Sequence, residues 1–295
     1  MKQAPIILFT YNRPLPTKKT VEALQKNVGA DQSDLFIFSD AAKKEEDISN
    51  VKQVREYLHT IGVFRSVTII ERESNYGLSN NIIDGVTQVV AKYKKAIVIE
   101  DDLLTSSHFL QFMNEGLEKY EHSYEVISIH GYCLPIEYPK DVFFLKGADC
   151  WGWATWERGW QLFDPDGMHL MKQLREQNSF YEFDLEGCYD YSGMLQKQVE
   201  GEINSWAIRW YASAFIHNKL TLYPGRSLVA NIGTDRSGTH AQNERMHRTQ
   251  LSDKRIVLED IPITDSKLAR KLISQKLFKH LGIKGKLKKV FKWGY

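Results

Sequence analysis

The sequence is poor in cysteine and contains no long apolar run. Its three cysteines, Cys133, Cys150 and Cys188, have the spacing of neither a disulfide framework nor a metal site, which favours a reducing compartment. No segment approaches the roughly 18 consecutive apolar residues of a membrane-spanning helix, and the apolar stretch near the N-terminus is too short for a signal peptide. We therefore expect a cytoplasmic protein, either soluble or bound peripherally to a membrane.

Glycine is missing from the turn after the first predicted strand, and the chain shows no internal repeat or low-complexity segment. Residues 10–14 are Thr-Tyr-Asn-Arg-Pro, whereas P-loops and dinucleotide-binding turns require glycines there. The same absence disfavours sugar nucleotidyltransferases, whose first loop is rich in glycine. Arg13 could reach a diphosphate or a base from this turn, although an isolated surface arginine is as common.

Charge is distributed unevenly along the chain. Residues 264–295 hold ten Lys or Arg and one acid, whereas the other 263 residues hold 29 basic and 36 acidic side chains. The basic residues alternate with Leu, Ile, Phe and Trp, as in segments that lie on anionic membranes. A solvated terminal helix is the simpler alternative. Nucleic acid is not expected as a partner, because the rest of the chain is acidic.

The first 120 residues alternate between strand and helix patterns, and this predicts an α/β fold with a mostly parallel sheet flanked by helices. The expected strands cover 5–10, 35–39, 67–70 and 96–99. The expected helices cover 17–28, 48–61, 80–93 and 109–120, with Ser79 as the N-cap of the third. After residue 126 the pattern changes to short strands at 126–130 and 142–145 between loops rich in Trp, Gly, Pro and Asp, which predicts a mixed α+β half.

Three consecutive acids, Glu100, Asp101 and Asp102, follow the fourth predicted strand. Open α/β sheets bind their ligands at the carboxyl ends of the strands. Adjacent carboxylates at that position repel one another and lose solvation, so they need a cation. Hard oxygen ligands favour Mg²⁺ or Mn²⁺, usually shared with a phosphate. A solvated acidic loop is the alternative.

The loop at residues 71–81 is a second candidate for ligand binding. Asn75 and Gly77 suit a turn with positive φ, and the helix that starts near Ser79 offers an N-terminus to an anion. Turn chemistry alone would also explain these residues.

Four tryptophans in residues 151–160 form an aromatic segment. Trp151, Trp153 and Trp160 could offer flat apolar faces to sugar rings. The alternative is a place in the core, which we expect for about two of the four tryptophans.

The ordered segments PIILFTYNRP, FIFSDA, NYGLSNNIIDG and AIVIEDDL together resemble the nucleotide-sugar-binding half of GT-A glycosyltransferases. They are most similar to the large inverting family that makes bacterial polysaccharides, and Glu-Asp-Asp-Leu is similar to N-acetylglucosaminyltransferase I. With GADCWGWATWERGW and LTLYPGRSLVANIGTDRSGTH, the resemblance covers about residues 5–240. It implies a nucleotide-sugar-binding half at 1–103, an acceptor-binding and catalytic half at 104–263, and a basic amphipathic tail at 264–295.

The resemblance implies a metal-dependent glycosyltransferase that inverts the anomeric centre. It would move a sugar from a nucleotide-diphosphate sugar, first of all a UDP-sugar such as UDP-N-acetylglucosamine, to a hydroxyl of a glycan or lipid-linked acceptor. The setting would be cell-surface polysaccharide synthesis, at the inner face of the cell membrane. The alternative is a non-catalytic protein of the same fold that binds sugar nucleotides or glycans, or, with less support, a sugar nucleotidyltransferase.

Carried over residue by residue, the resemblance also implies a set of site residues. Asp102, Asp101 and His240 would bind Mn²⁺ or Mg²⁺, and the segment from Gly233 to His240 would close as a lid. The residues implied in donor binding are Thr10, Asn12, Arg13, Asp40, Asn75, Gly77, Asn81, Asp101 and His240. The residues implied in acceptor binding are Trp151, Trp153, Trp206 and Arg209.

The general base is the open point of this assignment, because Ala207 follows Trp206 where many relatives have Asp. The remaining candidates are Glu202, Glu157, Asp149 and Asp190, in which Glu202 ranks first and Glu157 second. A structural role is the alternative for each of them.

Overall fold

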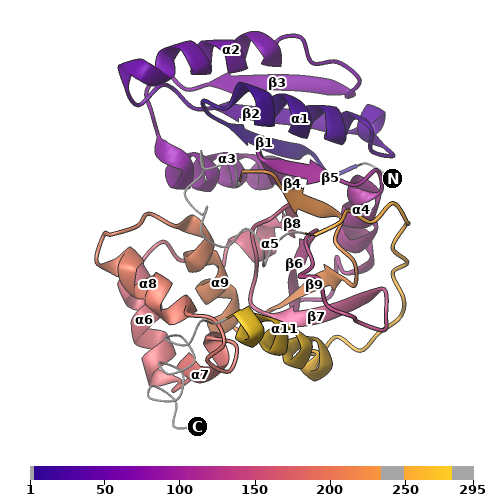
Figure 1. Cartoon of the computed structure of the whole chain (residues 1–295), viewed down its shortest axis with the longest axis vertical. Helices are drawn as coiled ribbons and strands as arrows, with labels where there is room; N and C mark the ends of the chain where they lie inside the picture. Colours follow the sequence, from indigo (N-terminus) through magenta and orange to yellow (C-terminus); the bar gives the residue numbers. More distant parts are fainter. Residues whose placement is uncertain (1–2, 234–248, 281–295) are drawn as a thin grey trace.

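The computed structural model describes residues 3–233 and 249–280, and an eight-stranded mixed sheet runs through it (Figure 1). The strands lie in the order β3-β2-β1-β4-β8-β6-β9-β7. They are β1 (Ile6–Thr10), β2 (Asp34–Ser39), β3 (Ser66–Glu71), β4 (Lys95–Glu100), β6 (Val126–His130), β7 (Val142–Lys146), β8 (Trp153–Trp156) and β9 (Leu220–Pro224). A separate antiparallel pair joins β5 (Leu103–Thr105) to β10 (Val229–Asn231).

The N-terminal half of the sheet is parallel. β1 pairs with β2 on one side and β4 on the other, and β2 pairs with β3. Every residue of β1 is buried, as expected for a strand covered on both faces. The register aligns Thr10 with Ser39 and Phe9 with Glu100, so these strands end together at one edge of the sheet.

Helices cover both faces of this sheet. α1 (Pro14–Gln25), α2 (Ile48–Leu58) and α4 (Phe109–Lys119) share one apolar core with the strands. α3 (Gly77–Tyr93), α5 (Glu157–Trp160) and α9 (Trp206–Ile216) contribute to a second core. Two short 3₁₀ helices, η1 (Ala30–Gln32) and η2 (Glu45–Asp47), complete the first half.

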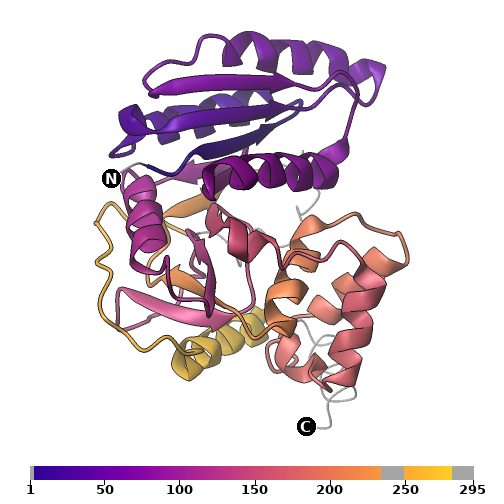
Figure 2. The same cartoon turned by 180° about the vertical axis from the view of Figure 1, so that it is seen from behind.

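The second half continues the same sheet through β8, which is antiparallel to both β4 and β6. β6 is parallel to β9, and β7 is antiparallel to β9. α6 (Gly167–Glu176), α7 (Phe180–Phe183) and α8 (Tyr191–Val199) gather with α9 at one side of this half (Figures 1 and 2). The predicted α/β class, with a mostly parallel sheet flanked by helices and a mixed second half, is confirmed.

The predicted starts of two helices are wrong. α1 begins at Pro14, whose fixed φ suits a first helical turn, rather than at Thr17. α3 begins at Gly77, so Ser79 is a buried residue of the first turn and not the N-cap. The Ser79 hydroxyl accepts a hydrogen bond from Arg209 instead. The group that caps α3 is the carboxylate of Asp40. Local sequence patterns cannot reveal this cap, because Asp40 is distant from α3 in the sequence.

The first part of the expected basic tail belongs to the folded body. α11 (Lys267–His280) packs beside β7 and buries Ala269 and Leu277. Asp265 accepts a hydrogen bond from the backbone N–H of Lys146 at 3.0 Å and forms an ion pair with Arg270. Residues 281–295 lie outside the described part. Within that part, no helix is both long and apolar enough to cross a membrane.

Candidate functional site

Arg13 places a positive charge beside the acids that follow β4. Its guanidinium pairs with Asp101, and its Nη1 donates to Oδ2 of Asp102 at 3.1 Å. Asp101 is buried, and its Oδ2 also lies 3.4 Å from the backbone N–H of Tyr11 and 3.5 Å from the Thr17 hydroxyl. Asp102 is half-buried. The turn after β1 and the acids after β4 therefore form one charged cluster.

The three acids are poorly solvated despite this cation. Burial, and then the charges of Asp102 and Asp101, raise the pKa of Glu100 to about 8. Burial raises the pKa of Asp101 to about 6, although the positive charge of Arg13 opposes the rise. A carboxylate cluster with raised pKa values at the ligand-binding edge of a sheet is typical of functional sites.

The end of β10 lies against Asp102. The N–H of Ile232 donates to the backbone carbonyl of Asp102 at 2.8 Å. A Cβ added to Gly233 would overlap the Asp102 carboxylate and come within 3.1 Å of Arg13 Nη1. A larger residue at position 233 would therefore displace the Asp102 carboxylate from its place beside Arg13. The expected lid starts at Gly233, but the rest of it, including His240, lies outside the described residues.

Asp40 caps α3 from the end of β2. Its Oδ1 accepts from the backbone N–H of Tyr76 at 2.8 Å, and its Oδ2 accepts from that of Gly77 at 2.9 Å. The Asn75 amide also donates to Asp40 Oδ2, at 3.1 Å. Gly77 has the positive φ of 70° that the sequence predicts for this turn. Asp40, Asn75 and Gly77 are therefore brought together, with α3 starting at the ligand edge.

The remaining donor-binding candidates lie around this cluster. The Thr10 hydroxyl is buried and has no hydrogen-bond partner among the residues described. Asn12 donates to Asp47 Oδ1 at 2.7 Å, and the Tyr11 hydroxyl donates to Asp47 Oδ2 at 2.7 Å. Asn81 is buried and accepts from Arg72 Nε at 2.9 Å, so it positions the loop before α3. Sequence reasoning did not identify Asp47 as the acceptor for Asn12 and Tyr11, because this contact forms only where the loops after β1 and β2 meet.

Three of the expected sugar platforms are core residues. Trp153 and Trp206 are 1% and 3% exposed, and their rings stack with centroids 5.5 Å apart. Trp160 is also buried, and Trp160 and Trp210 pack against Trp153 at 5.7 Å each. The expectation that Trp153, Trp160 and Trp206 present faces to a sugar is corrected by this packing, since large aromatic side chains favour apolar surroundings.

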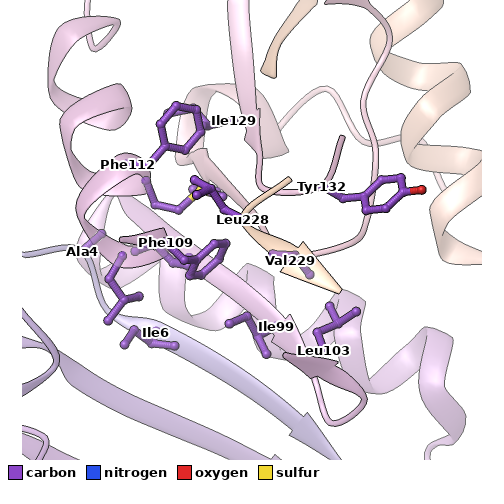
Figure 3. Packing of buried hydrophobic residues seen from close by; sticks show 14 of the residues in the cluster. Ala4, Ile6, Ile99, Leu103, Phe109, Phe112, Ile129, Tyr132, Leu228 and Val229 are labelled. Atoms are coloured by element: carbon purple, nitrogen blue, oxygen red, sulfur yellow. The ribbon is translucent and has the colours of Figure 1, made fainter. Parts of the chain in front are cut away.

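Trp151 is placed differently from these tryptophans. It is half-buried, and its backbone N–H donates to Nε2 of the buried His130 at 3.1 Å. Its ring meets that of Tyr132 edge to face with centroids 4.8 Å apart. Figure 3 shows the Tyr132 hydroxyl pointing away from the labelled apolar side chains of the core. Trp151 is therefore the expected platform that remains at the border of the core. His130 and Tyr132 were missed by sequence reasoning, since only the end of β6 brings them here.

Arg209 joins α9 to the start of α3. It is buried, and its guanidinium donates to Ser79 Oγ at 2.6 Å, Pro165 O at 3.1 Å and Ser205 O at 3.2 Å. Burial lowers the pKa of Arg209. None of the acids considered as bases forms an ion pair with it in the described structure.

The structure separates the four candidate bases. Glu157 lies at the opposite end of β4, where both its carboxylate oxygens are 2.9 Å from Lys94 Nζ. Glu202, in the turn before α9, and Asp190, at the start of α8, are exposed. Asp149 is half-buried in the segment that leads to β8, and its charge and those of Glu100 and Asp102 act together on Cys150. The structure therefore leaves Glu157 far from the acidic strand end, whereas Asp149 lies in a segment that continues past the carboxyl end of β4.

The described residues supply two of the three expected metal ligands. Asp101 and Asp102 offer hard carboxylate oxygens, and within residues 3–233 and 249–280 the Asp102 carboxylate is engaged only through Oδ2. No group of three His, Cys, Asp or Glu side chains suited to a metal occurs in these ranges.

Neither a family model nor a curated protein matches the chain. Solved structures that align with it include the mannosyltransferase PcManGT from Pyrobaculum calidifontis in complex with GDP-Man and Mn²⁺, at 12% identity and a TM-score of 0.32, over 45% of this chain and 36% of that one. S. aureus TarS 1-349 aligns at 12% identity and a TM-score of 0.33, over 50% of this chain and 42% of that one. Its complex with UDP-GlcNAc aligns at 10% identity and a TM-score of 0.29, over 50% and 35%. The chain thus spans less than half the length of each of these three structures.

Proposed function

We propose that the protein is a GT-A-type glycosyltransferase that uses a nucleotide-diphosphate sugar, with a UDP-sugar as the first candidate. The observation that carries this proposal is the cluster of Arg13, Asp101 and Asp102 at the carboxyl ends of β1 and β4. It lies beside the end of β2, where Asp40 holds the start of α3. The motif order of the sequence supports the same reaction.

The donor would lie along this edge of the sheet. Arg13 supplies a forked donor for phosphate oxygens. The Thr10 hydroxyl, which has no partner among residues 3–233 and 249–280, is proposed to form a hydrogen bond with the donor. Asp40, Asn75 and Gly77 shape the turn where α3 presents its N-terminus. In this proposal Arg13 exchanges its carboxylate partners for the diphosphate when the donor binds.

A divalent cation fits the oxygen ligands of Asp101 and Asp102, with His240 as the proposed third ligand. When bound, it supplies positive charge to the departing diphosphate. Residues of the protein carry out the two other roles. They hold the donor at the strand ends, and a carboxylate removes the proton from the acceptor hydroxyl as that oxygen attacks the anomeric carbon. A single displacement of this kind inverts the anomeric centre.

The acceptor would be a hydroxyl of a glycan or of a lipid-linked sugar, in cell-surface polysaccharide synthesis. Support for a peripheral place at the inner face of the cell membrane comes from the basic C-terminal segment and from the exposed Leu268 and Phe278 of α11. Trp151 and Arg209 stay as proposed contributors to the acceptor side.

A thermal-shift screen of UDP-N-acetylglucosamine, UDP-glucose and GDP-mannose, each with and without Mn²⁺, tests the proposal. A ligand at a hundred times its dissociation constant adds about 2.7 kcal/mol to the stability of the folded protein. We expect a UDP-sugar to raise the melting temperature, and Mn²⁺ to increase the rise. No shift with any donor, or the same shift in an Arg13→Ala variant, would contradict the assignment of this edge.

A further inference from the structure

The segment between β7 and β8 is held against the ligand edge of the sheet by backbone contacts. The N–H of Trp151 donates to His130 Nε2 at 3.1 Å, and the carbonyl of Gly152 accepts from the N–H of Gly131 at 2.7 Å. Because β6 runs in the same direction as β4, His130 and Glu100 end their strands at the same edge. Asp149 lies in the same segment, two residues before Trp151.

Asp149 is a half-buried acid beside a cluster of aromatic side chains. A Cβ added to Gly147, two residues before it, would overlap the ring of Tyr211, and the rings of Tyr189, Tyr191 and Tyr211 follow one another with centroids 4.4 and 4.3 Å apart. Its Oδ1 accepts from the backbone N–H of Cys150 at 2.8 Å. Burial raises the pKa values of five surrounding tyrosines, and the charge of Asp149 adds to the rise in each. These are Tyr132, Tyr189, Tyr191, Tyr211 and Tyr223. Tyr189, Tyr191 and Trp151 are only partly buried. Flat, partly exposed rings with one central carboxylate suit a polyhydroxylated ligand.

The other acids lack this combination. Glu202 and Asp190 are exposed, and Glu157 is held by Lys94 at the far end of β4. The register of β8 places Asp149 at the acidic edge. β8 runs antiparallel to β4 with Trp153 opposite Val98, so the residues before Trp153 continue past the carboxyl end of β4. In agreement with this, the charges of Asp149, Glu100 and Asp102 all contribute, after burial, to the raised pKa of the Cys150 thiol. Asp149 therefore lies at the edge where a donor at Asp102 would present its sugar.

We propose that Asp149 is the general base of the transfer and takes the role of the Asp that many relatives have where this chain has Ala207. The partly exposed Tyr189, Tyr191 and Trp151 would border the acceptor site. The inference rests on the proposed glycosyltransferase function. As the acceptor oxygen forms its bond to the anomeric carbon, an Asp149 oxygen takes the hydroxyl proton. The bond from the anomeric carbon to the diphosphate oxygen breaks, and its electron pair leaves with the nucleoside diphosphate. Asp149 then returns the proton to water.

The test compares Asp149→Asn with Glu118→Gln, a matched amide control at an exposed position of α4. Glu202→Gln and Asp190→Asn, at two other candidate bases, are measured beside them. Turnover is measured as UDP or GDP release from UDP-N-acetylglucosamine, UDP-glucose and GDP-mannose, with hexosides or water as acceptor. Donor affinity is measured by calorimetry. We expect Asp149→Asn to lose about 10²–10⁴-fold in turnover while its donor affinity stays within about threefold. Glu118→Gln should keep turnover within about threefold of the unmodified protein, and Glu202→Gln and Asp190→Asn should lose less than Asp149→Asn.

The asparagine keeps an oxygen that can accept from the Cys150 N–H, so the fold should persist, and an unchanged melting temperature checks this. Asp149→Glu provides a second variant and should retain more turnover than Asp149→Asn. Turnover in Asp149→Asn within tenfold of the unmodified protein, or an equal loss in Glu202→Gln, would overturn the assignment of Asp149. No nucleotide release by the unmodified protein from any donor would instead overturn the proposed function, and the two failures are thereby distinguished.

Discussion

The guanidinium of Arg13 pairs with the carboxylate of Asp101, 88 positions later in the chain. This ion pair joins the turn after β1 to the acids after β4. It also means that the folded protein already holds a positive charge where a cation was expected from the sequence. Ligand binding at this edge must therefore rearrange an existing contact, and this makes the cluster testable by mutation.

The pH dependence of stability should reveal the acid cluster. Glu100 and Asp101 bind protons more tightly in the folded protein than in the unfolded chain. Their contribution to stability is fully present below about pH 4, and it is lost as the pH rises through about 6 for Asp101 and about 8 for Glu100. Glu100→Gln should therefore stabilise the protein at pH 9, by about 1–3 kcal/mol. Urea unfolding from pH 4 to 9 measures this. Glu118→Gln, at an exposed position of α4, is the control, and parallel pH curves for Glu100→Gln and the unmodified protein would contradict the expectation.

Removing the Asp102 carboxylate should separate metal-dependent binding from folding. Asp102→Ala should leave the pair of β5 and β10 in place, because the N–H of Ile232 donates to the backbone carbonyl of residue 102 and not to this side chain. We expect donor affinity to lose its response to Mn²⁺ while the melting temperature stays within a few degrees. Calorimetry with and without Mn²⁺ measures the donor affinity, and Asp31→Ala on the exposed surface is the control variant. An undiminished Mn²⁺ effect in Asp102→Ala would remove this residue from the metal site.

Asp40 should have a measurable structural role in addition to its proposed place in donor binding. Asp40→Ala removes the acceptor for the N–H groups of Tyr76 and Gly77, and loss of such a cap costs about 1–2 kcal/mol. Asp40→Asn retains one acceptor and should lose less. Chemical unfolding compares the two variants. If both unfold like the unmodified protein, Asp40 does not cap α3.

The two classes of tryptophan should respond differently to truncation. Trp153→Ala would leave a cavity among Trp160, Trp206 and Trp210 and should cost about 3–5 kcal/mol of unfolding free energy. Trp151→Ala, at a half-buried position, should cost clearly less. Denaturant titration of both variants tests this, and equal losses would show that Trp151 is as much a core residue as Trp153.

Membrane attachment should depend on the end of the chain without depending on the fold. Truncation after His280 removes five lysines and spares α11. We expect the truncated protein to keep its melting temperature and to leave anionic liposomes, since each basic residue near such a surface contributes about 1 kcal/mol. Salt at about 0.5 M should weaken the binding of the full chain in the same way. Liposome co-sedimentation measures both effects. If the full chain does not bind anionic liposomes at low salt, the C-terminal segment does not attach the protein to membranes. Deletion from residue 264 is a different experiment, because it would expose the core beside β7.

Local patterns in the sequence determined the elements of the fold and the composition of the acidic edge. Continuous apolar runs predict β1, β2 and β4, and the acids that end β4 fall at the ligand edge because parallel strands end together. Helical periodicity predicts α2 and α4 to within a few residues, because the buried face of a helix carries apolar residues at regular intervals.

Only the tertiary structure decided which residues meet. Three relationships depend on strand order and on contacts between distant segments: Arg13 as the partner of Asp101, Asp40 as the cap of α3, and the segment of Asp149 beside a cluster of tyrosines. The burial of Trp153 and the removal of Glu157 to the opposite end of β4 depend on them as well. The physical reason is that periodicity records whether a side chain is buried, but not which side chain it is buried against.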